Sequence, residues 1–167
     1  MNLYERLSRQ PVTASAPCRV DLGGTLDIGV FFLALADKRP ATFNLALDLR
    51  TRVELLPHTP GKIKVSSKGF EPAEFDRGKA PFDHPMGLVF AVAQYFDVHG
   101  VHIHISSASP PRSALGGSSA AEAAVIAAIM HACGMDIQPQ AVVHLAQSIE
   151  SASAGVVCGV QDHAAAV

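Results

Sequence analysis

The sequence has few cysteines and no surplus of positive charge, and each shortage limits what the protein can be. Cys18, Cys133 and Cys158 are odd in number and widely spaced, so they indicate neither a disulfide scaffold nor a cysteine metal site. A formal net charge of -2 offers no basic surface for nucleic acid. We therefore expect reduced, mostly buried thiols in a cytoplasmic protein that does not bind nucleic acid.

Long apolar runs are also missing. No stretch of about eighteen or more apolar residues occurs, so we expect no membrane span. Residues 1–10 lack the apolar core of a signal peptide. The absence of a Gly-Lys-Ser/Thr element disfavours a P-loop NTPase, and the absence of Gly-x-Gly-x-x-Gly after the first expected strand disfavours a dinucleotide-binding domain.

A hydrophobic fraction of 49% is enough for one domain with a core, which we place at residues 1–167. Phe43, Leu45, Leu47 and Leu49 alternate with polar or small residues, the period of a half-buried strand. Together the patterns predict a mixed α and β unit, with residues 69–85 as its most loop-like region. The expected strands cover 16–22, 43–49, 52–56, 62–66 and 101–105, and the expected helices cover 85–96, 120–134 and 139–153.

The segment Pro110-Pro-Arg-Ser-Ala-Leu-Gly-Gly-Ser-Ser-Ala120 leads directly into an alanine-rich stretch of strong helix formers. Small residues at the start of a helix leave backbone N–H groups at the positive end of the helix dipole, and phosphate is their common ligand. The alternative is an ordinary N-cap, in which the hydroxyl oxygen of Ser118 or Ser119 accepts a hydrogen bond from one of these N–H groups. The residues of this segment alone leave both interpretations open.

Two carboxylates occupy unusual positions. Glu150 falls on the same face as Val143 in the expected helix, at the edge of an apolar stripe where an unpaired charge is costly. It could be an Mg²⁺ ligand, a solvated edge residue or a salt-bridge partner. Asp162 lies in a neutral, glycine-punctuated segment and could be a general base or the N-cap of a short helix at 164–166.

Two histidines on the expected strand 101–105 are a further candidate metal site. His102 and His104 share one face of it, a spacing that suits a metal ion, but no carboxylate or cysteine pattern accompanies them. We therefore expect them to be solvated or packed on the sheet.

Taken in order, three segments resemble the N-terminal half of the GHMP kinases, the family of galactokinase, homoserine kinase, mevalonate kinase and phosphomevalonate kinase. They are Ala16-Pro-Cys-Arg-Val-Asp-Leu-Gly-Gly24, the Pro110–Ala120 loop, and Glu150 followed by Gly159-Val-Gln-Asp162. The first is similar to the version found in heptose and fucose kinases. The resemblance implies an α+β fold, in which a two-layer arrangement of a mixed sheet and helices forms a ribosomal-protein-domain-like ATP-binding domain.

The resemblance also implies the cofactors ATP and Mg²⁺ and a role for each matching residue. Ser118 and Glu150 would hold Mg²⁺. Asp162 would orient or deprotonate the acceptor hydroxyl, and Arg19 would steady the transferring phosphoryl group. The ATP phosphates would be surrounded by Pro110, Ser113, Ala114, Leu115, Gly116, Gly117, Ser118, Ser119 and Ala120. The substrate would be contacted by Gly24, Asp27, Gly159 and His163, although His163 also suits a plain helix-start position.

The implied activity is transfer of the ATP γ-phosphate to a hydroxyl of a sugar or sugar phosphate. Two alternatives are a non-catalytic nucleotide- or sugar-binding module of the same fold and a mevalonate-pathway-type kinase or decarboxylase. Family members are longer and carry a C-terminal domain with a further glycine-rich motif, which we expect to be missing here. We therefore expect little or no kinase activity from this chain alone, and self-association through the face left uncovered. Ala114 departs from the family, whose loop has glycine at this position.

Overall fold

The computed structural model describes residues 3–24, 36–39, 41–110, 113–155 and 157–167. None of the helices in this part of the chain combines the length and the apolar character needed to cross a membrane. The elements, in chain order, are α1 (Leu3–Arg9), β1 (Val12–Gly24), the 3-10 helix η1 (Ala36–Lys38), β2 (Thr42–Pro57), β3 (Lys62–Ser67), β4 (Ala73–Asp76), α3 (Gly87–Tyr95), β5 (Val101–Ser107), α4 (Gly117–Ala132), α5 (Pro139–Ala154) and α6 (Gln161–Ala165).

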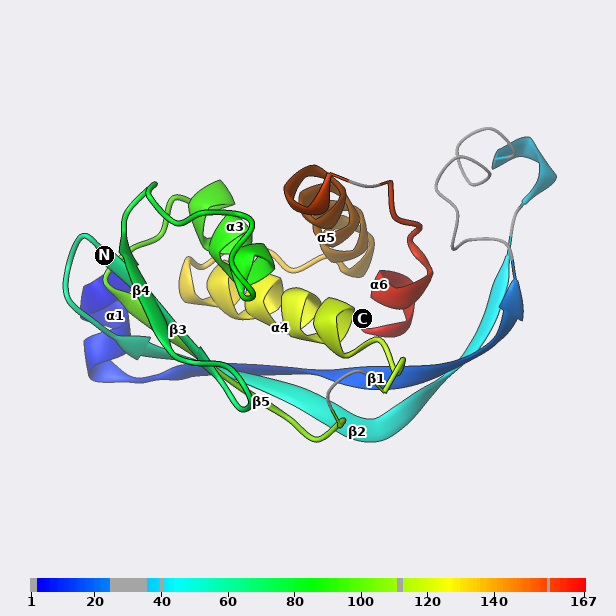
Figure 1. Ribbon diagram of the computed structural model, residues 1–167, viewed down its shortest axis with the longest axis horizontal. Coiled ribbons are helices and arrows are strands. Elements are labelled where there is room, and N and C mark those ends of the chain that lie inside the picture. Colours follow the sequence, from blue (N-terminus) through cyan, green and yellow to red (C-terminus); the bar gives the residue numbers. More distant parts are fainter. Residues whose placement is uncertain (1–2, 25–35, 40, 111–112, 156) are drawn as a thin grey trace.

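The described strands form one five-stranded sheet in the order β1-β2-β5-β3-β4. Neighbouring strands run antiparallel except β3 and β5, which run parallel, so the sheet is mixed. Figure 1 shows α3, α4 and α5 over one face of this sheet. The predicted α+β fold, with a mixed sheet in one layer and helices in the other, is confirmed.

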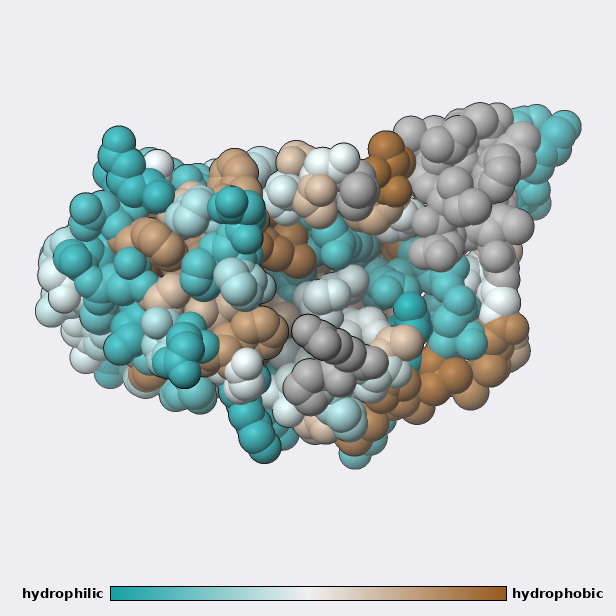
Figure 2. All heavy atoms as spheres, viewed as in Figure 1, coloured by the Kyte–Doolittle hydropathy of each residue, from teal (hydrophilic) through white to brown (hydrophobic). Residues whose placement is uncertain are grey.

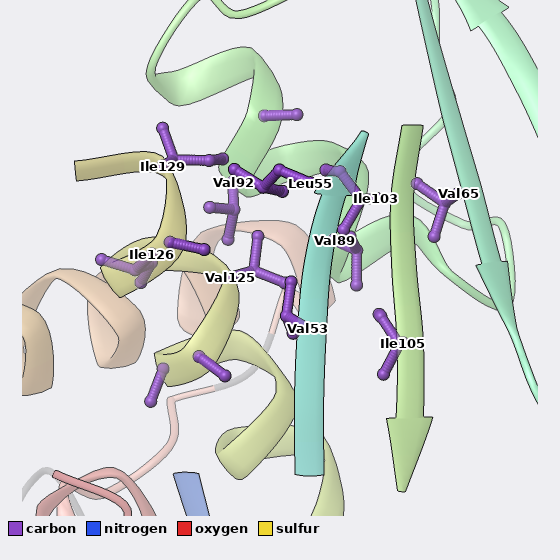
Figure 3. Packing of buried hydrophobic residues seen from close by; sticks show 14 of the residues in the cluster. Val53, Leu55, Val65, Val89, Val92, Ile103, Ile105, Val125, Ile126 and Ile129 are labelled. Atoms are coloured by element: carbon purple, nitrogen blue, oxygen red, sulfur yellow. The ribbon is translucent and has the colours of Figure 1, made fainter. Parts of the chain in front are cut away.

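Helix α4 is the centre of the core. It contacts β1, β2 and β5 on one side and α3 and α5 on the other, which is why apolar residues cover nearly all of its surface. Burying each large aliphatic side chain contributes about 1.5–3 kcal/mol relative to leaving it exposed. Figure 3 shows how side chains of two helices and the sheet meet there, with Val125, Ile126 and Ile129 from α4, Val89 and Val92 from α3, and Val53, Leu55, Ile103 and Ile105 from the sheet.

The predicted strand at 43–49 exists as part of β2, but the prediction that it is half-buried is wrong. Phe43 is 63% exposed and Leu45 is 52% exposed. This end of β1 and β2 extends beyond the helical layer (Figure 1), and Figure 2 shows apolar surface along it. The alternating pattern identifies side chains that share one face of a strand. It does not say whether a second layer covers that face.

Other elements differ from expectation as well: α1 and η1 have no counterpart among the expected helices, and β4 and the start of α4 also differ. Strand β4 lies within 69–85, where we expected a loop; its four residues pair with β3 at the edge of the sheet. So short a strand carries too few residues for a periodic pattern. Helix α4 begins at Gly117 rather than near Ala120, which changes the interpretation of the serines between them.

Candidate active site

The N-terminus of α4 has no side-chain cap among the described residues. Its N-cap is Gly116, in the left-handed conformation with φ 67. Ser118 and Ser119 lie inside the first turn, so the ordinary serine N-cap that we kept as an alternative is wrong. The first-turn N–H groups of this sixteen-residue helix are thus left for a ligand, at the positive end of its dipole.

Glycine at the start of α4 allows the loop to lie close to its neighbours. A Cβ on Gly116 would come within 3.3 Å of Arg19 Cγ, and one on Gly117 within 3.0 Å of Ser109 Oγ. Ala114 adopts φ 57 without being glycine. The position at which the sequence departs from the family's glycine is therefore a position where the backbone favours glycine.

Three hydroxyl groups in contact with one another link β2 to the segment that leads into the 110–120 loop. Thr51 Oγ1 lies 3.0 Å from Ser107 Oγ, which lies 2.9 Å from Ser109 Oγ. Thr51 is fully buried in β2, so the contacts connect the core of the sheet to the segment that enters the loop. Sequence reasoning missed these residues because no local spacing relates Thr51 to the two serines.

The course of β1 brings Arg19 to the site. The pairing of β1 with β2 shifts register between Pro17 and Cys18. Proline has no N–H to donate to the ladder, so an irregularity at this point is expected. Such a shift bends the strand and redirects the side chains that follow, including that of Arg19.

Arg19 joins three parts of the chain. Its Nε and Nη2 donate to Oδ1 of Asp162 at 2.9 and 2.5 Å. Its Nη1 donates to the carbonyl oxygen of Ala114 at 2.8 Å, and its backbone N–H donates to that of Leu115 at 2.9 Å. The structure therefore brings the expected pair together and ties it to the loop.

Asp162 is the second residue of α6, whose N-cap is Val160. The alternative in which Asp162 caps this helix is therefore wrong. Both guanidinium contacts go to Oδ1, while Oδ2 lies 3.7 Å from the position that a Cβ on Gly116 would take. One carboxylate oxygen is thus held by Arg19, and the other is directed towards the start of α4.

A second charged cluster lies on the other side of α6. His163 Nε2 lies 3.2 Å from Oε2 of Glu122 and 3.1 Å from Oε2 of Glu150. Glu150 thus has the ion-pair partner that one of our alternatives predicts. The side chain of His163 is 1% exposed, which argues against a substrate contact. Its place in the first turn of α6 agrees with the helix-start position.

Burial and pairing shift the pKa values of this cluster. Burial raises the pKa of Glu122 to about 7, against the opposing effect of its hydrogen bond with His163. The hydrogen bond with His163 lowers the pKa of Glu150, which is 23% exposed. Burial disfavours the charged imidazole of His163, but its two carboxylate partners outweigh it and raise the pKa to about 9.

Glu122 is the charged residue that sequence reasoning missed. It is a single carboxylate in an otherwise apolar stretch of α4 and is fully buried. The argument applied to Glu150, that a carboxylate on an apolar face needs a partner, applies to it equally. That signal was present in the sequence.

The structure describes two of the remaining residues expected to contact the substrate. Gly24 is the last residue of β1, and Gly159 is buried just before α6. Asp27 lies outside the described residues. His102 and His104 pack on the sheet, where both contact Ser66 Oγ, at 2.7 and 2.9 Å.

The fold and these contacts define an α+β domain in which an uncapped helix N-terminus lies beside a carboxylate–guanidinium pair. The family model for the GHMP kinases N terminal domain matches residues 84–167. The chain belongs to the GHMP kinase family. Comparison with curated protein sequences gives no match.

Solved structures share this fold. A D-glycero-D-manno-heptose 1-phosphate kinase from Bacteroides thetaiotaomicron matches with a TM-score of 0.78 and 20% identity, over 92% of this chain and 52% of that one. The galactokinase of Lactococcus lactis, complexed with galactose, matches with a TM-score of 0.71 and 18% identity. The match covers 98% of this chain and 45% of the galactokinase chain. The mevalonate kinase of Methanococcus jannaschii matches with a TM-score of 0.71 and 15% identity. The match covers 91% of this chain and 49% of the mevalonate kinase chain. The chain thus spans about half the length of these structures.

Proposed function

We propose that this chain is the nucleotide-binding half of an ATP-dependent small-molecule kinase. The reaction is transfer of the ATP γ-phosphate to a hydroxyl of a sugar or sugar phosphate. The observation that carries the proposal is the Arg19–Asp162 pair at the uncapped N-terminus of α4. This arrangement sets a fixed positive charge and a carboxylate beside a helix end that suits phosphate.

The residues present fit ATP and Mg²⁺. The free N–H groups of the first turn of α4 would bind phosphate oxygens, and the glycines before them let the nucleotide approach the backbone. The exposed Ser118 and the partly exposed Glu150 offer the oxygen ligands that Mg²⁺ prefers. When bound, Mg–ATP supplies the transferable phosphoryl group and the charge that neutralises its oxygens.

The chain's own residues would position the acceptor. Asp162 Oδ2 would accept the hydrogen bond of the acceptor hydroxyl and, as transfer proceeds, its proton. Arg19 holds Oδ1 at two contacts, so the carboxylate has one orientation. The guanidinium also stands next to the loop, where positive charge stabilises the transferring group.

Sugars are the acceptor class that we favour. The heptose 1-phosphate kinase and the galactokinase among the structural neighbours act on sugars by name, and the segment 16–24 resembles the sugar-kinase version. The mevalonate kinase neighbour supports a second candidate, a mevalonate-type acceptor. The three free thiols suit the reducing cytoplasm in which we expect the enzyme to work.

The chain alone should bind nucleotide but transfer phosphate slowly. Phosphoryl transfer depends on electrostatic closure around the phosphates, and we propose that a further domain forms the other wall of the cleft. The test is titration calorimetry with Mg–ATP, together with phosphate-transfer assays on a sugar panel. The assays use both this chain and any longer product of the same reading frame. Fast turnover by these 167 residues would contradict the two-walled cleft.

Asp162→Asn is the sharpest variant for the reaction itself. We expect it to lower turnover by about 100- to 10,000-fold, because a general base is lost, and to leave Mg–ATP affinity nearly unchanged. Asp48→Asn is the matched control, since Asp48 is an exposed carboxylate on β2. Undiminished turnover in Asp162→Asn would refute the catalytic role. Nucleotide binding without transfer in every form of the protein would indicate a non-catalytic binding module.

A further inference from the structure

Three helices bring one side chain each to a common point. Glu122 comes from α4, Glu150 from α5 and His163 from α6. Their ligand atoms all lie within 4.8 Å of one another. These helices contact one another in pairs, so the cluster is a product of their packing and sits inside the protein.

Hydrogen bonding leaves this cluster incomplete. His163 Nε2 bonds with Glu122, while Glu150 meets the same ring nitrogen as an ion pair. Within the described part of the chain, Glu122 Oε1 and His163 Nδ1 are buried without any hydrogen-bond partner. A buried polar atom left unpaired costs about 1–3 kcal/mol. Two carboxylates also face a single imidazole, so the cluster is short of positive charge.

We propose that Glu122, Glu150 and His163 form a binding site for a divalent transition-metal ion, with Mn²⁺ and Zn²⁺ as the ions that fit. Ligand atoms bound at about 2.1 Å to one octahedral or tetrahedral ion lie roughly 3.0–3.4 Å apart. The two N···O distances at Nε2, 3.2 and 3.1 Å, match that spacing. The ion would replace the proton that the three groups now share.

The donor set determines which ions fit. Imidazole nitrogen suits zinc and other transition metals, whereas Mg²⁺ and Ca²⁺ prefer oxygen ligands only. Binding through both oxygens of Glu122 would satisfy the orphaned Oε1. With Nε2 as the ligand, the neutral ring of His163 keeps its proton on Nδ1.

This site is distinct from the magnesium role proposed above. It has a nitrogen ligand, and it shares only Glu150, whose 23% exposed side chain is its contact with solvent. The inference does not rest on phosphoryl transfer, because the ion should bind without nucleotide. A chain that binds the ion and transfers no phosphate would support this inference while contradicting the proposed function.

The experiment is titration calorimetry of the nucleotide-free chain with Mn²⁺ and with Zn²⁺, with bound metal measured after dialysis. We expect one ion per chain that excess Mg²⁺ does not displace. Glu122→Gln and His163→Gln should each weaken binding by about 100-fold or more, because loss of a residue that only supports a ligand already costs about 10- to 100-fold. Ser118→Ala, which removes the proposed magnesium hydroxyl, should bind the ion normally. So should the double variant His102→Gln, His104→Gln, which removes the imidazoles on the sheet.

Two results would overturn the site. One is stoichiometry that falls to zero in the His102→Gln, His104→Gln variant. The other is unchanged affinity in Glu122→Gln and His163→Gln proteins that keep the wild-type circular dichroism. If both buried variants fail to fold, the site is tested by pulsed electron paramagnetic resonance of Mn²⁺ bound to the His102→Gln, His104→Gln variant, which keeps His163. Coupling of the Mn²⁺ electron spin to one imidazole nitrogen would support the site, and a spectrum without this coupling would reject the site.

Discussion

Arg19 shows how much of the site depends on a single side chain. Its guanidinium and backbone together contact Asp162, Ala114 and Leu115. Both partners of the ion pair are largely buried, with side-chain exposures of 14% for Arg19 and 28% for Asp162. Loss of the arginine would therefore both leave a carboxylate unpaired and release the loop.

At the residue scale, we predict that Ala114→Gly stabilises the protein by about 0.5–1 kcal/mol. A non-glycine residue in the left-handed region costs roughly 1–2 kcal/mol, part of which the greater chain entropy of unfolded glycine offsets. Gly155→Ala is the matched control, because Gly155 has φ 66 and open space around its Cβ position. It should destabilise by about 1 kcal/mol. Urea unfolding of both variants measures the change in the free energy of unfolding. A lower free energy of unfolding in Ala114→Gly would contradict the prediction.

At the scale of elements, α6 separates two charged clusters. Asp162 faces Arg19 and the loop, while the adjacent His163 faces Glu122 and Glu150. Neighbouring residues on a helix point in different directions, so this one short helix contributes to both clusters. Changes in the packing of α6 should therefore affect both.

The second cluster predicts how stability depends on pH. The pKa values of Glu122 and His163 are raised from 4.5 to about 7 and from 6.5 to about 9. At these two groups the folded chain binds more protons than the unfolded chain over these ranges, so they make the free energy of unfolding fall as pH rises. Burial lowers the pKa of His102, which acts in the same window with the opposite sign. We expect a loss on the order of 3 kcal/mol from each of the two groups between about pH 5 and pH 9. The lowered pKa values of Glu74 and Glu150 act below this window.

Urea unfolding in the presence of a chelator, at several pH values across this window, is the measurement. His163→Gln should flatten the alkaline part of the profile, and His131→Gln, which changes an exposed histidine at the end of α4, should not. A free energy of unfolding that stays constant or increases towards about pH 9 would show that the pair is not coupled as described.

At the scale of the whole molecule, one end of the sheet is uncovered. Leu22, Phe43, Leu45 and Leu49 are all exposed on the ends of β1 and β2, and Figure 2 shows the apolar surface that results. Contiguous exposed apolar surface of this kind marks a site of interaction. In a chain half as long as its structural neighbours, we propose that this surface packs against another part of the protein or another copy.

We therefore predict that the chain self-associates. Sedimentation velocity should show species larger than a monomer, and Leu45→Ser should shift the population towards the monomer by removing apolar contact area. Tyr95→Ser is the control, because Tyr95 is equally exposed but lies on α3. A wild-type chain that sediments as a monomer at all concentrations tested would disprove the prediction.

The sequence predicted the parts of the fold that depend on near neighbours. The alternation of Val101, Ile103 and Ile105 correctly identified β5 and its buried face. Proline at the start of α5 identified where that helix begins. The loop before α4 also followed from local composition, although the serine-cap alternative failed because Gly116 takes the cap position.

What the sequence determined by itself is most of the longer helices and strands, the glycine-rich helix start and the family, because these follow from the order and identity of adjacent residues. Only the tertiary structure decided which charges meet. Arg19 and Asp162 are 143 positions apart, and Glu122 and His163 are 41 apart. Their encounter depends on how the helices pack on the sheet, as does the exposure of Phe43. The identity of a distant partner and the presence of a covering layer are properties of that packing, and no local pattern encodes them.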